Sequence, residues 1–248
     1  MIAFGTRARA EATRRAVPVQ LEDGISRLFH KSEWMDTGQD PELSPSIFLV
    51  EQPAHSVAPA HFHRQNQFQL FIEGDGQIGR RPLQPLTVHY AGAYTGYGPL
   101  VAGPDGLKYF TIRPVFETGL TPVSEREKMV RGPKRHEHAG PVRIADPSQL
   151  RTLRGQAQDD VIPLGADGLG VTLAEVPAGE ALVPDRPPHA GNLFIVVLAG
   201  QLNAASQSLG QWESMFISAD EAVPDMVAAA SGLQVALLYT PEKAAAYL

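Results

Sequence analysis

The chain has 248 residues, of which 43% are hydrophobic and 19% are charged, and its formal net charge is −6. This length suits two domains of ordinary size, and a mildly acidic chain is a poor candidate for binding the phosphates of nucleic acids. There is no cysteine, which excludes disulfides, thiolate metal sites and cysteine nucleophiles.

Residues 1–40 are predicted to form an irregular lead-in, in which 24–35 (GISRLFHKSEWM) could pair as an edge strand. The first residues lack the apolar core of a signal peptide. The longest apolar run, 193–200 (LFIVVLAG), is far shorter than the roughly 20 residues of a membrane span. We therefore expect a soluble cytoplasmic protein that binds neither membranes nor nucleic acid.

Short strand-like segments separated by Gly- and Pro-containing turns fill residues 41–118. The 23 Gly and 21 Pro favour many short strands over long helices, so the sequence predicts an all-β fold. The predicted strands are SIFLVEQ (46–52), QFQLFIEG (67–74), LTVHYA (86–91) and LKYFTIRPVF (107–116).

Residues 119–164 are predicted to connect this block to a second one. The connector carries His136 and His138 in charged, turn-rich surroundings, which favours a solvated loop. Strand-like segments then return in 165–248. The two blocks repeat the same order of features with a period of roughly 130 residues, which indicates a duplicated domain.

The stretch HFHRQNQFQLFIEGDG (61–76) carries the strongest functional signal. His61 and His63 share one face of a strand, because alternate residues point the same way, and two such imidazoles can bind one divalent ion. A surface pair that arises by chance is the alternative. Gln67, Gln69 and Phe71 share a face as well, which predicts an uncharged polar pocket wall.

These residues resemble the first motif of the cupin superfamily, which has His-x-His, then Glu after three or four residues, and Gly about six residues later. Here His61 and His63 are followed by Gln67 in place of the glutamate, and then by Gly74. The second motif, Pro-x-Gly-x-x-His, is not visible in 93–106, although His89 lies a few residues earlier. The second block has Pro187 and His189 where the family has its two histidines.

The resemblance implies a bicupin, with two tandem jelly-roll β-barrels at 41–118 and 165–248. The first barrel would hold one divalent metal ion (Fe, Mn, Ni or Zn) on His61, His63 and Gln67, aided by His89. Gln69, Phe71, Tyr97 and Tyr109 would contact the substrate. The second barrel would be degenerate, structural and free of metal.

The family uses this scaffold for several kinds of reaction, so the first hypothesis is a metal-dependent dioxygenase, isomerase or lyase acting on a small polar substrate. The second hypothesis is a non-catalytic bicupin that binds or senses a small ligand without metal. The glutamine at 67 and the missing second motif favour the second hypothesis. A third is a role in dimerisation, as a homodimer paired through sheet edges.

Overall fold

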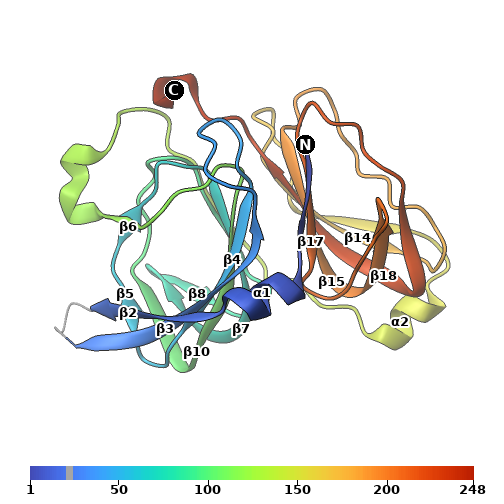
Figure 1. Ribbon diagram of the computed structural model, residues 1–248, viewed down its shortest axis with the longest axis horizontal. Coiled ribbons are helices and arrows are strands. Elements are labelled where there is room, and N and C mark those ends of the chain that lie inside the picture. Colours follow the sequence, from blue (N-terminus) through green and yellow to red (C-terminus); the bar gives the residue numbers. More distant parts are fainter. Residues whose placement is uncertain (21–24) are drawn as a thin grey trace. The chain divides into compact units, whose positions relative to one another are not determined.

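The computed structural model describes residues 1–20 and 25–248. The chain forms two compact units, one of residues 8–142 and 243–248 and the other of residues 1–7 and 143–242. We name them the first and the second barrel (Figure 1). Each is built on an antiparallel sheet, which confirms the predicted all-β class. Within the described residues no helix is long and apolar enough to cross a membrane.

The sheet of the first barrel has the strand order β12-β9-β7-β10-β4-β3-β2, with β5 paired to β10 and β8 to β7. Two short strands, β6 and β11, form a separate pair. Their bounds are β2 (Arg15–Gln20), β3 (Ser26–Asp36), β4 (Ser46–Gln52), β5 (Val57–Ala58), β6 (His61–Phe62), β7 (Gln67–Ile78), β8 (Arg81–Leu83), β9 (Val88–Ala91), β10 (Leu100–Arg113), β11 (Thr121–Pro122) and β12 (His136–Ala139).

The sheet of the second barrel has the order β1-β17-β15-β18-β14-β13, with β16 paired to β15. This order matches β12-β9-β7-β10-β4-β3 strand for strand, so the repeat in the sequence is a repeat of topology. The bounds are β1 (Ile2–Gly5), β13 (Ala157–Ile162), β14 (Gly170–Val176), β15 (Asn192–Ala204), β16 (Gln207–Leu209), β17 (Ser214–Ile217) and β18 (Met226–Thr240).

Two pairs of glycines occupy corresponding positions in the two sheets. A Cβ at Gly74 would lie 2.0 Å from the carbonyl oxygen of Gly106, and a Cβ at Gly200 would lie 2.0 Å from that of Gly232. Gly74 and Gly200 also have positive φ angles, +81° and +78°. Only glycine allows two backbones to approach so closely in this conformation, so the duplication preserves a steric requirement.

The lead-in at 1–40 is not irregular as predicted, although the strand expected within 24–35 is present as β3. After β1, a helix α1 (Arg7–Thr13) leads into β2 and β3. Residues 26–31 of β3 pair with β2, and residues 30–36 pair with β4. The physical reason is that the exposed edge of β4 is covered by β3, which buries Phe29 and Trp34. Gly24, the first residue of the segment expected to pair, lies outside the described residues.

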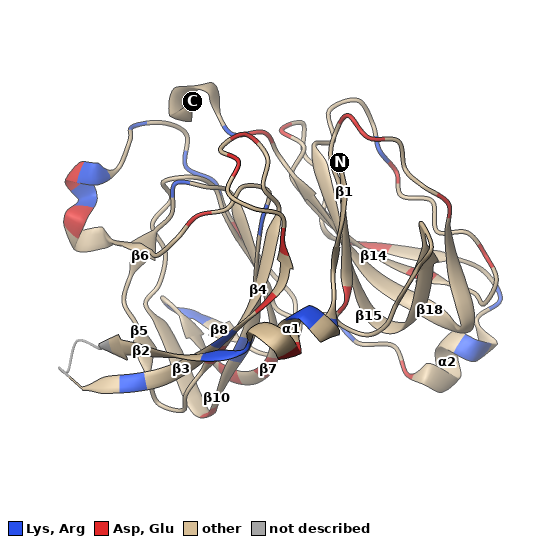
Figure 2. Ribbon diagram, in the orientation of Figure 1, with Lys and Arg blue, Asp and Glu red and all other residues tan. Residues whose placement is uncertain are grey.

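The segment predicted as a connector also contains regular structure. It holds β11, a 3₁₀ helix η1 (Val123–Lys128), β12, a helix α2 (Pro147–Thr152) and β13, and a second 3₁₀ helix, η2 (Ala245–Tyr247), lies near the C-terminus. Helix α2 begins at Asp146, whose carboxylate accepts a hydrogen bond from the Ser148 backbone N–H. Lys, Arg, Asp and Glu are scattered over both barrels (Figure 2).

The inner face of the first barrel is partly polar. On β10 and β7, Tyr109 pairs with Phe71 and Thr111 pairs with Gln69. Arg113, two residues further along β10, shares this face because side chains alternate along a strand. The sequence pattern therefore directs an amide, a hydroxyl and a guanidinium into the barrel.

The corresponding face of the second barrel is apolar. On β18 and β15, Val235 pairs with Val197 and Leu237 pairs with Ile195. These four side chains are fully buried in one hydrophobic cluster, which fills the interior. His189 is exposed in a turn. The two barrels thus share a topology but differ in what occupies their interiors.

Candidate functional site

Tyr97 lies beside the histidine pair, although it is far away in the sequence. His61 forms an isolated antiparallel bridge with Tyr97, with two backbone N–H···O hydrogen bonds of 3.0 Å. Both side chains are buried, and their ring centroids lie 4.5 Å apart. The loop between β9 and β10 thus places a phenol against the first histidine.

The hydrogen bonds of His61 determine its tautomer. Nδ1 lies 2.6 Å from the carbonyl oxygen of Pro59, which can only accept, so Nδ1 carries the proton. Nε2 is then an acceptor, and the Tyr97 hydroxyl, 2.8 Å away, donates to it. Burial, aided by the positive charge of Arg113, lowers the pKa of His61 to about 4, so the ring is neutral near pH 7.

Gln67 connects Tyr97 to Arg113. The amide Nε2 of Gln67 donates to the Tyr97 hydroxyl over 2.5 Å, and its Oε1 accepts from Nε of Arg113 over 3.0 Å. Arg113 also donates from Nη1 to the backbone oxygen of Glu117 over 2.8 Å. The hydrogen bonds therefore run in one direction, from Arg113 through Gln67, Tyr97 and His61 to the Pro59 carbonyl.

His63 lies against the guanidinium group of Arg113. Nη2 of Arg113 is 3.1 Å from both ring nitrogens of His63. Burial, and then the charge of Arg113, holds the pKa of His63 well below its usual range. The nearest carboxylate oxygen, on Glu117, is 3.8 Å from Nδ1, but Glu117 also accepts hydrogen bonds from the backbone N–H and Nε of Arg64.

The geometry does not fit a divalent metal ion. The lone pair of His61 Nε2 and the oxygen of Gln67 already accept hydrogen bonds, and a cation lies against His63. At an effective dielectric constant of about 20, two unit charges 4 Å apart repel by about 4 kcal/mol, and a divalent ion doubles this. No group of three or more His, Asp or Glu side chains suited to a metal ion occurs among the described residues.

His89 lies on the other side of Tyr97, with ring centroids 4.9 Å apart. Its Nδ1 donates to Oε1 of Gln69 over 2.9 Å, so its Nε2 is an acceptor that faces Nε2 of His136 at 2.5 Å. The structure thus brings three of the predicted metal ligands, His61, His63 and Gln67, around Tyr97 and Arg113. It places His89 in a different hydrogen-bonded group.

The prediction that His136 and His138 lie in a solvated loop is wrong. Both belong to β12, which pairs with β9 so that His138 is opposite His89. Within the described residues, Nδ1 of His138 is buried and has no hydrogen-bond partner. An unpaired edge of β9 would leave its backbone groups exposed, and β12 pairs with that edge. The charged composition of the predicted connector did not indicate that it contains this strand.

A cavity of about 140 Å³ lies next to this network. Gln69, Tyr97 and Tyr109, three of the four residues expected to contact the substrate, line it, whereas Phe71 packs behind Tyr109 with ring centroids 5.1 Å apart. The full lining is Val19, Phe29, Lys31, Phe48, Val50, Ala58, Pro59, His61, His63, Gln69, Tyr97, Tyr109, Thr111, Arg113, Gly119 and Leu120.

Two charged residues that line this cavity, Lys31 and Arg113, were not among the predicted site residues. Lys31 lies in the segment expected to pair as an edge strand, but nothing in its local pattern indicated that it faces a cavity. Arg113 ends an apolar strand on the same face as Tyr109 and Thr111, and a charged residue at an inward position is the signal that could have revealed it, since buried charges are rare.

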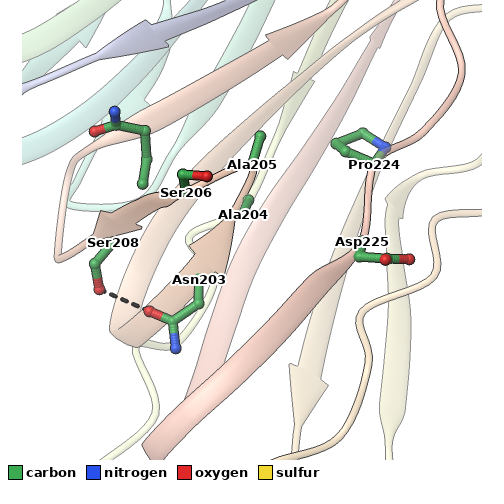
Figure 3. Close-up of a pocket in the computed structure, with 8 residues that line it drawn as sticks. Asn203, Ala204, Ala205, Ser206, Ser208, Pro224 and Asp225 are labelled. Atoms are coloured by element: carbon green, nitrogen blue, oxygen red, sulfur yellow. Dashed lines mark hydrogen bonds between the residues drawn. The ribbon is translucent and has the colours of Figure 1, made fainter.

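A larger hollow of about 570 Å³ lies in the second barrel, at the turn between β15 and β16 (Figure 3). Its lining includes Asn203, Ser208 and Asp225, and Oγ of Ser208 donates to Oδ1 of Asn203 over 2.7 Å. Most of its other residues have small side chains or are exposed. The smaller cavity of the first barrel is the better candidate, because buried polar groups converge on it.

The sequence matches no family model and no curated protein. Solved structures with similar folds are a Nostoc punctiforme protein (13% identity, 99% of this chain and 85% of that chain, TM-score 0.60), the pirin YhhW from Escherichia coli in complex with nickel(II) (15%, 97% and 99%, 0.58), and a deletion mutant of the oxalate decarboxylase OxdC from Bacillus subtilis (8%, 92% and 77%, 0.57).

These similarities extend over most of the chain and show that its fold is that of the cupin superfamily. More specifically, the fold consists of two tandem jelly-roll barrels like those of pirin. At such low identity the comparisons show the fold alone, and a fold does not determine a function.

Proposed function

We propose that the first barrel binds a small organic molecule in its cavity and uses no resident divalent metal ion. The observation that carries this proposal is the one-directional chain of hydrogen bonds from Arg113 to the Pro59 carbonyl. These hydrogen bonds occupy the atoms of His61 and Gln67 that would coordinate a metal ion. They also hold the positively charged Arg113 beside those atoms. Of the two main hypotheses from the sequence, this supports the ligand-binding bicupin.

The same network suits the wall of a binding site. Burial raises the pKa values of Tyr97 and Tyr109, so both hydroxyl groups stay protonated. Tyr97 donates its hydrogen bond to His61, and Tyr109 can donate one to a ligand. His61 is neutral and held by two hydrogen bonds. Side chains fixed in this way are preorganised, so a ligand orders few of them on binding, which favours affinity.

The second candidate function is the metal-dependent oxygenase, isomerase or lyase. It is favoured by the His-x-His spacing of His61 and His63 and by the nickel(II) bound to the structurally similar pirin. For that function Tyr97 and Arg113 would have to leave the histidines, which would break the hydrogen bonds described above. The arrangement of the site therefore favours the first candidate.

Metal analysis of the purified, untagged protein tests the proposal. We expect far less than one equivalent of Fe, Mn, Ni or Zn per chain, and no saturable binding when each ion is titrated by calorimetry. The matched variants are His61→Ala and His189→Ala, because His189 is an exposed histidine of the second barrel. One equivalent of metal that is lost in His61→Ala but retained in His189→Ala would overturn the proposal.

A further inference from the structure

Two cationic side chains in the cavity of the first barrel share one aromatic ring. Nζ of Lys31 lies 4.9 Å from the centroid of the Phe48 ring, and Cζ of Arg113 lies 5.5 Å from it. Lys31 is half-buried and Arg113 is 2% exposed. Both line the cavity, so positive charge is concentrated on one side of it.

The strand register explains why the two charges meet. Lys31 on β3 is opposite Val50 on β4, and Val50 is opposite Tyr109 on β10. Lys31 therefore lies on the inner face, in the same row as Tyr109. Arg113 lies four residues further along β10, on the same face. The backbone pairing, rather than an exposed flexible arm, holds both cations at the cavity.

The cavity supplies no negative charge to balance them. Its described lining residues include neither Asp nor Glu. The acidic groups that face it from neighbouring elements have other partners: Glu33 pairs with Arg15 at 2.8 Å, and Glu117 accepts from Arg64. Burial, and then the charge of Arg113, lowers the pKa of Lys31, and the charge of Glu33 offsets this only in part.

Arg113 retains donors for a ligand. A guanidinium group has five N–H bonds, and the contacts to Gln67, Glu117 and His63 engage Nε and one N–H on each terminal nitrogen. The described contacts leave one N–H on each terminal nitrogen. The hydroxyl of Thr111 lies on the same face of β10 and also lines the cavity.

The size and walls of the cavity limit the rest of the ligand. Its volume is about 140 Å³, and an apolar cavity of about 150 Å³ is large enough for one benzene ring. Phe29, Phe48 and Val50 provide apolar walls. A molecule with one ring, or a carbon chain of similar size, fits this space.

We infer that the ligand of the first barrel is a small organic anion, with its carboxylate between Lys31 and Arg113 and its apolar body against Phe48 and Tyr109. The inference rests on the proposed function and adds the chemical class of the ligand to it. A carboxylate would accept charge-assisted hydrogen bonds from the guanidinium and would neutralise two charges whose burial is otherwise costly.

Calorimetric titration with benzoate, benzamide and acetate tests the inference. Benzamide has the shape of benzoate without its charge, and acetate has the charge without the ring. We expect benzoate to bind at least about tenfold more tightly than benzamide, which lacks the charge-assisted hydrogen bond, and than acetate, which lacks the buried ring. Each of these interactions contributes at least that factor. Equal or tighter binding of benzamide would overturn the inference, and so would the absence of binding by benzoate.

Variants of Lys31 provide the second arm. Lys31→Met should weaken benzoate binding about tenfold or more and leave benzamide binding unchanged, and Lys31→Arg should restore benzoate binding. The matched control is Lys108→Met, because Lys108 pairs with Glu73 on the exposed side of the same sheet. Benzoate binding unaffected by Lys31→Met in a folded protein, verified by circular dichroism, would overturn the inference.

The two proposals fail in distinguishable ways. If metal-free protein binds benzamide but not benzoate, the inference of an anionic ligand is wrong, whereas the proposed metal-free binding site stands. One equivalent of metal bound through His61 overturns the proposed function and the inference that rests on it.

Discussion

The Tyr97 hydroxyl donates a hydrogen bond of 2.8 Å to Nε2 of His61, because Nδ1 of the same ring donates to the Pro59 carbonyl. The two residues also pair through their backbones. The lone pair that would bind a metal ion is thus engaged by a side chain held in place by two backbone hydrogen bonds. Four predictions follow from this relationship and from the surrounding structure.

Tyr97→Phe should lower the free energy of unfolding by about 1–3 kcal/mol, because it leaves two buried groups, His61 Nε2 and Gln67 Nε2, without a partner. Urea unfolding followed by circular dichroism measures the change. Tyr94→Phe is the control, since Tyr94 is only partly buried, and it should have an effect close to zero. Equal effects of the two variants would contradict the hydrogen-bond assignment.

The double variant Tyr97→His with Arg113→Ala should gain a metal site. It adds a third imidazole beside His61 and His63 and removes the cation that lies against His63. Titration with Zn(II) or Ni(II), followed by calorimetry, should show about one ion bound per chain. Arg113→Ala alone should bind more weakly, and a folded double variant without metal binding would contradict the prediction.

The protein should lose stability in mild acid. His61 has a pKa of about 4 in the folded chain and an ordinary value of 6.5, so below pH 6.5 the unfolded state takes up a proton that the folded state refuses. The contribution of neutral His61 to the free energy of unfolding is fully present above pH 6.5 and is lost as the pH drops towards 4. For this group the loss between about pH 7.5 and about pH 5 is about 2 kcal/mol.

Urea unfolding at these two pH values tests this loss, with His61→Gln as the comparison. The variant cannot take up the proton at position 61 and should lose less stability than the wild type. Burial lowers the pKa values of His63 and His89 as well, so a smaller acid effect should remain in the variant. Identical losses in the two proteins would show that His61 does not titrate in this way.

Gly74→Ala should be severely destabilising for two reasons. The added Cβ would overlap the carbonyl oxygen of Gly106, and the alanine backbone would have to adopt a positive φ. Gly119→Ala is the matched control, since Gly119 has a φ of +71° but no atom within 4 Å of the added Cβ. The control should cost about 1–2 kcal/mol from backbone strain alone. Thermal unfolding compares the two, and the steric argument requires a much larger loss for Gly74→Ala.

Much of the fold could be predicted from local patterns. Partial alternation in QFQLFIEG and the short apolar run in 193–200 indicated strands at β7 and β15, and the repeated order of features predicted two barrels of the same topology. The pattern failed in most of 1–40, apart from the strand expected within 24–35, and in 119–164. There, strands are stabilised by covering the edges of β4, β9, β14 and β17, and a segment's own composition does not report which edge it will cover.

The candidate site was predicted in part. The spacing of His61, His63 and Gln67 correctly indicated side chains that converge, and the structure brings all three together. Tyr97 and Tyr109, which were expected to contact the substrate, line the cavity. The partners that define the chemistry were not evident, because Arg113 is 50 residues from His63 and because the local pattern in the segment of Lys31 does not show that its strand faces the cavity.

By itself the sequence determined how apolar and polar side chains alternate along the strands, and therefore which strand faces are buried. It also determined that the barrel motif occurs twice. Only the tertiary structure decided that a guanidinium and a phenol, rather than a third imidazole and a carboxylate, would meet the histidine pair. The physical reason is that alternation along a strand is a local property of the backbone. Contacts between distant strands depend on sheet register and loop closure, and the charge state of a buried group depends on all the neighbours that these bring to it.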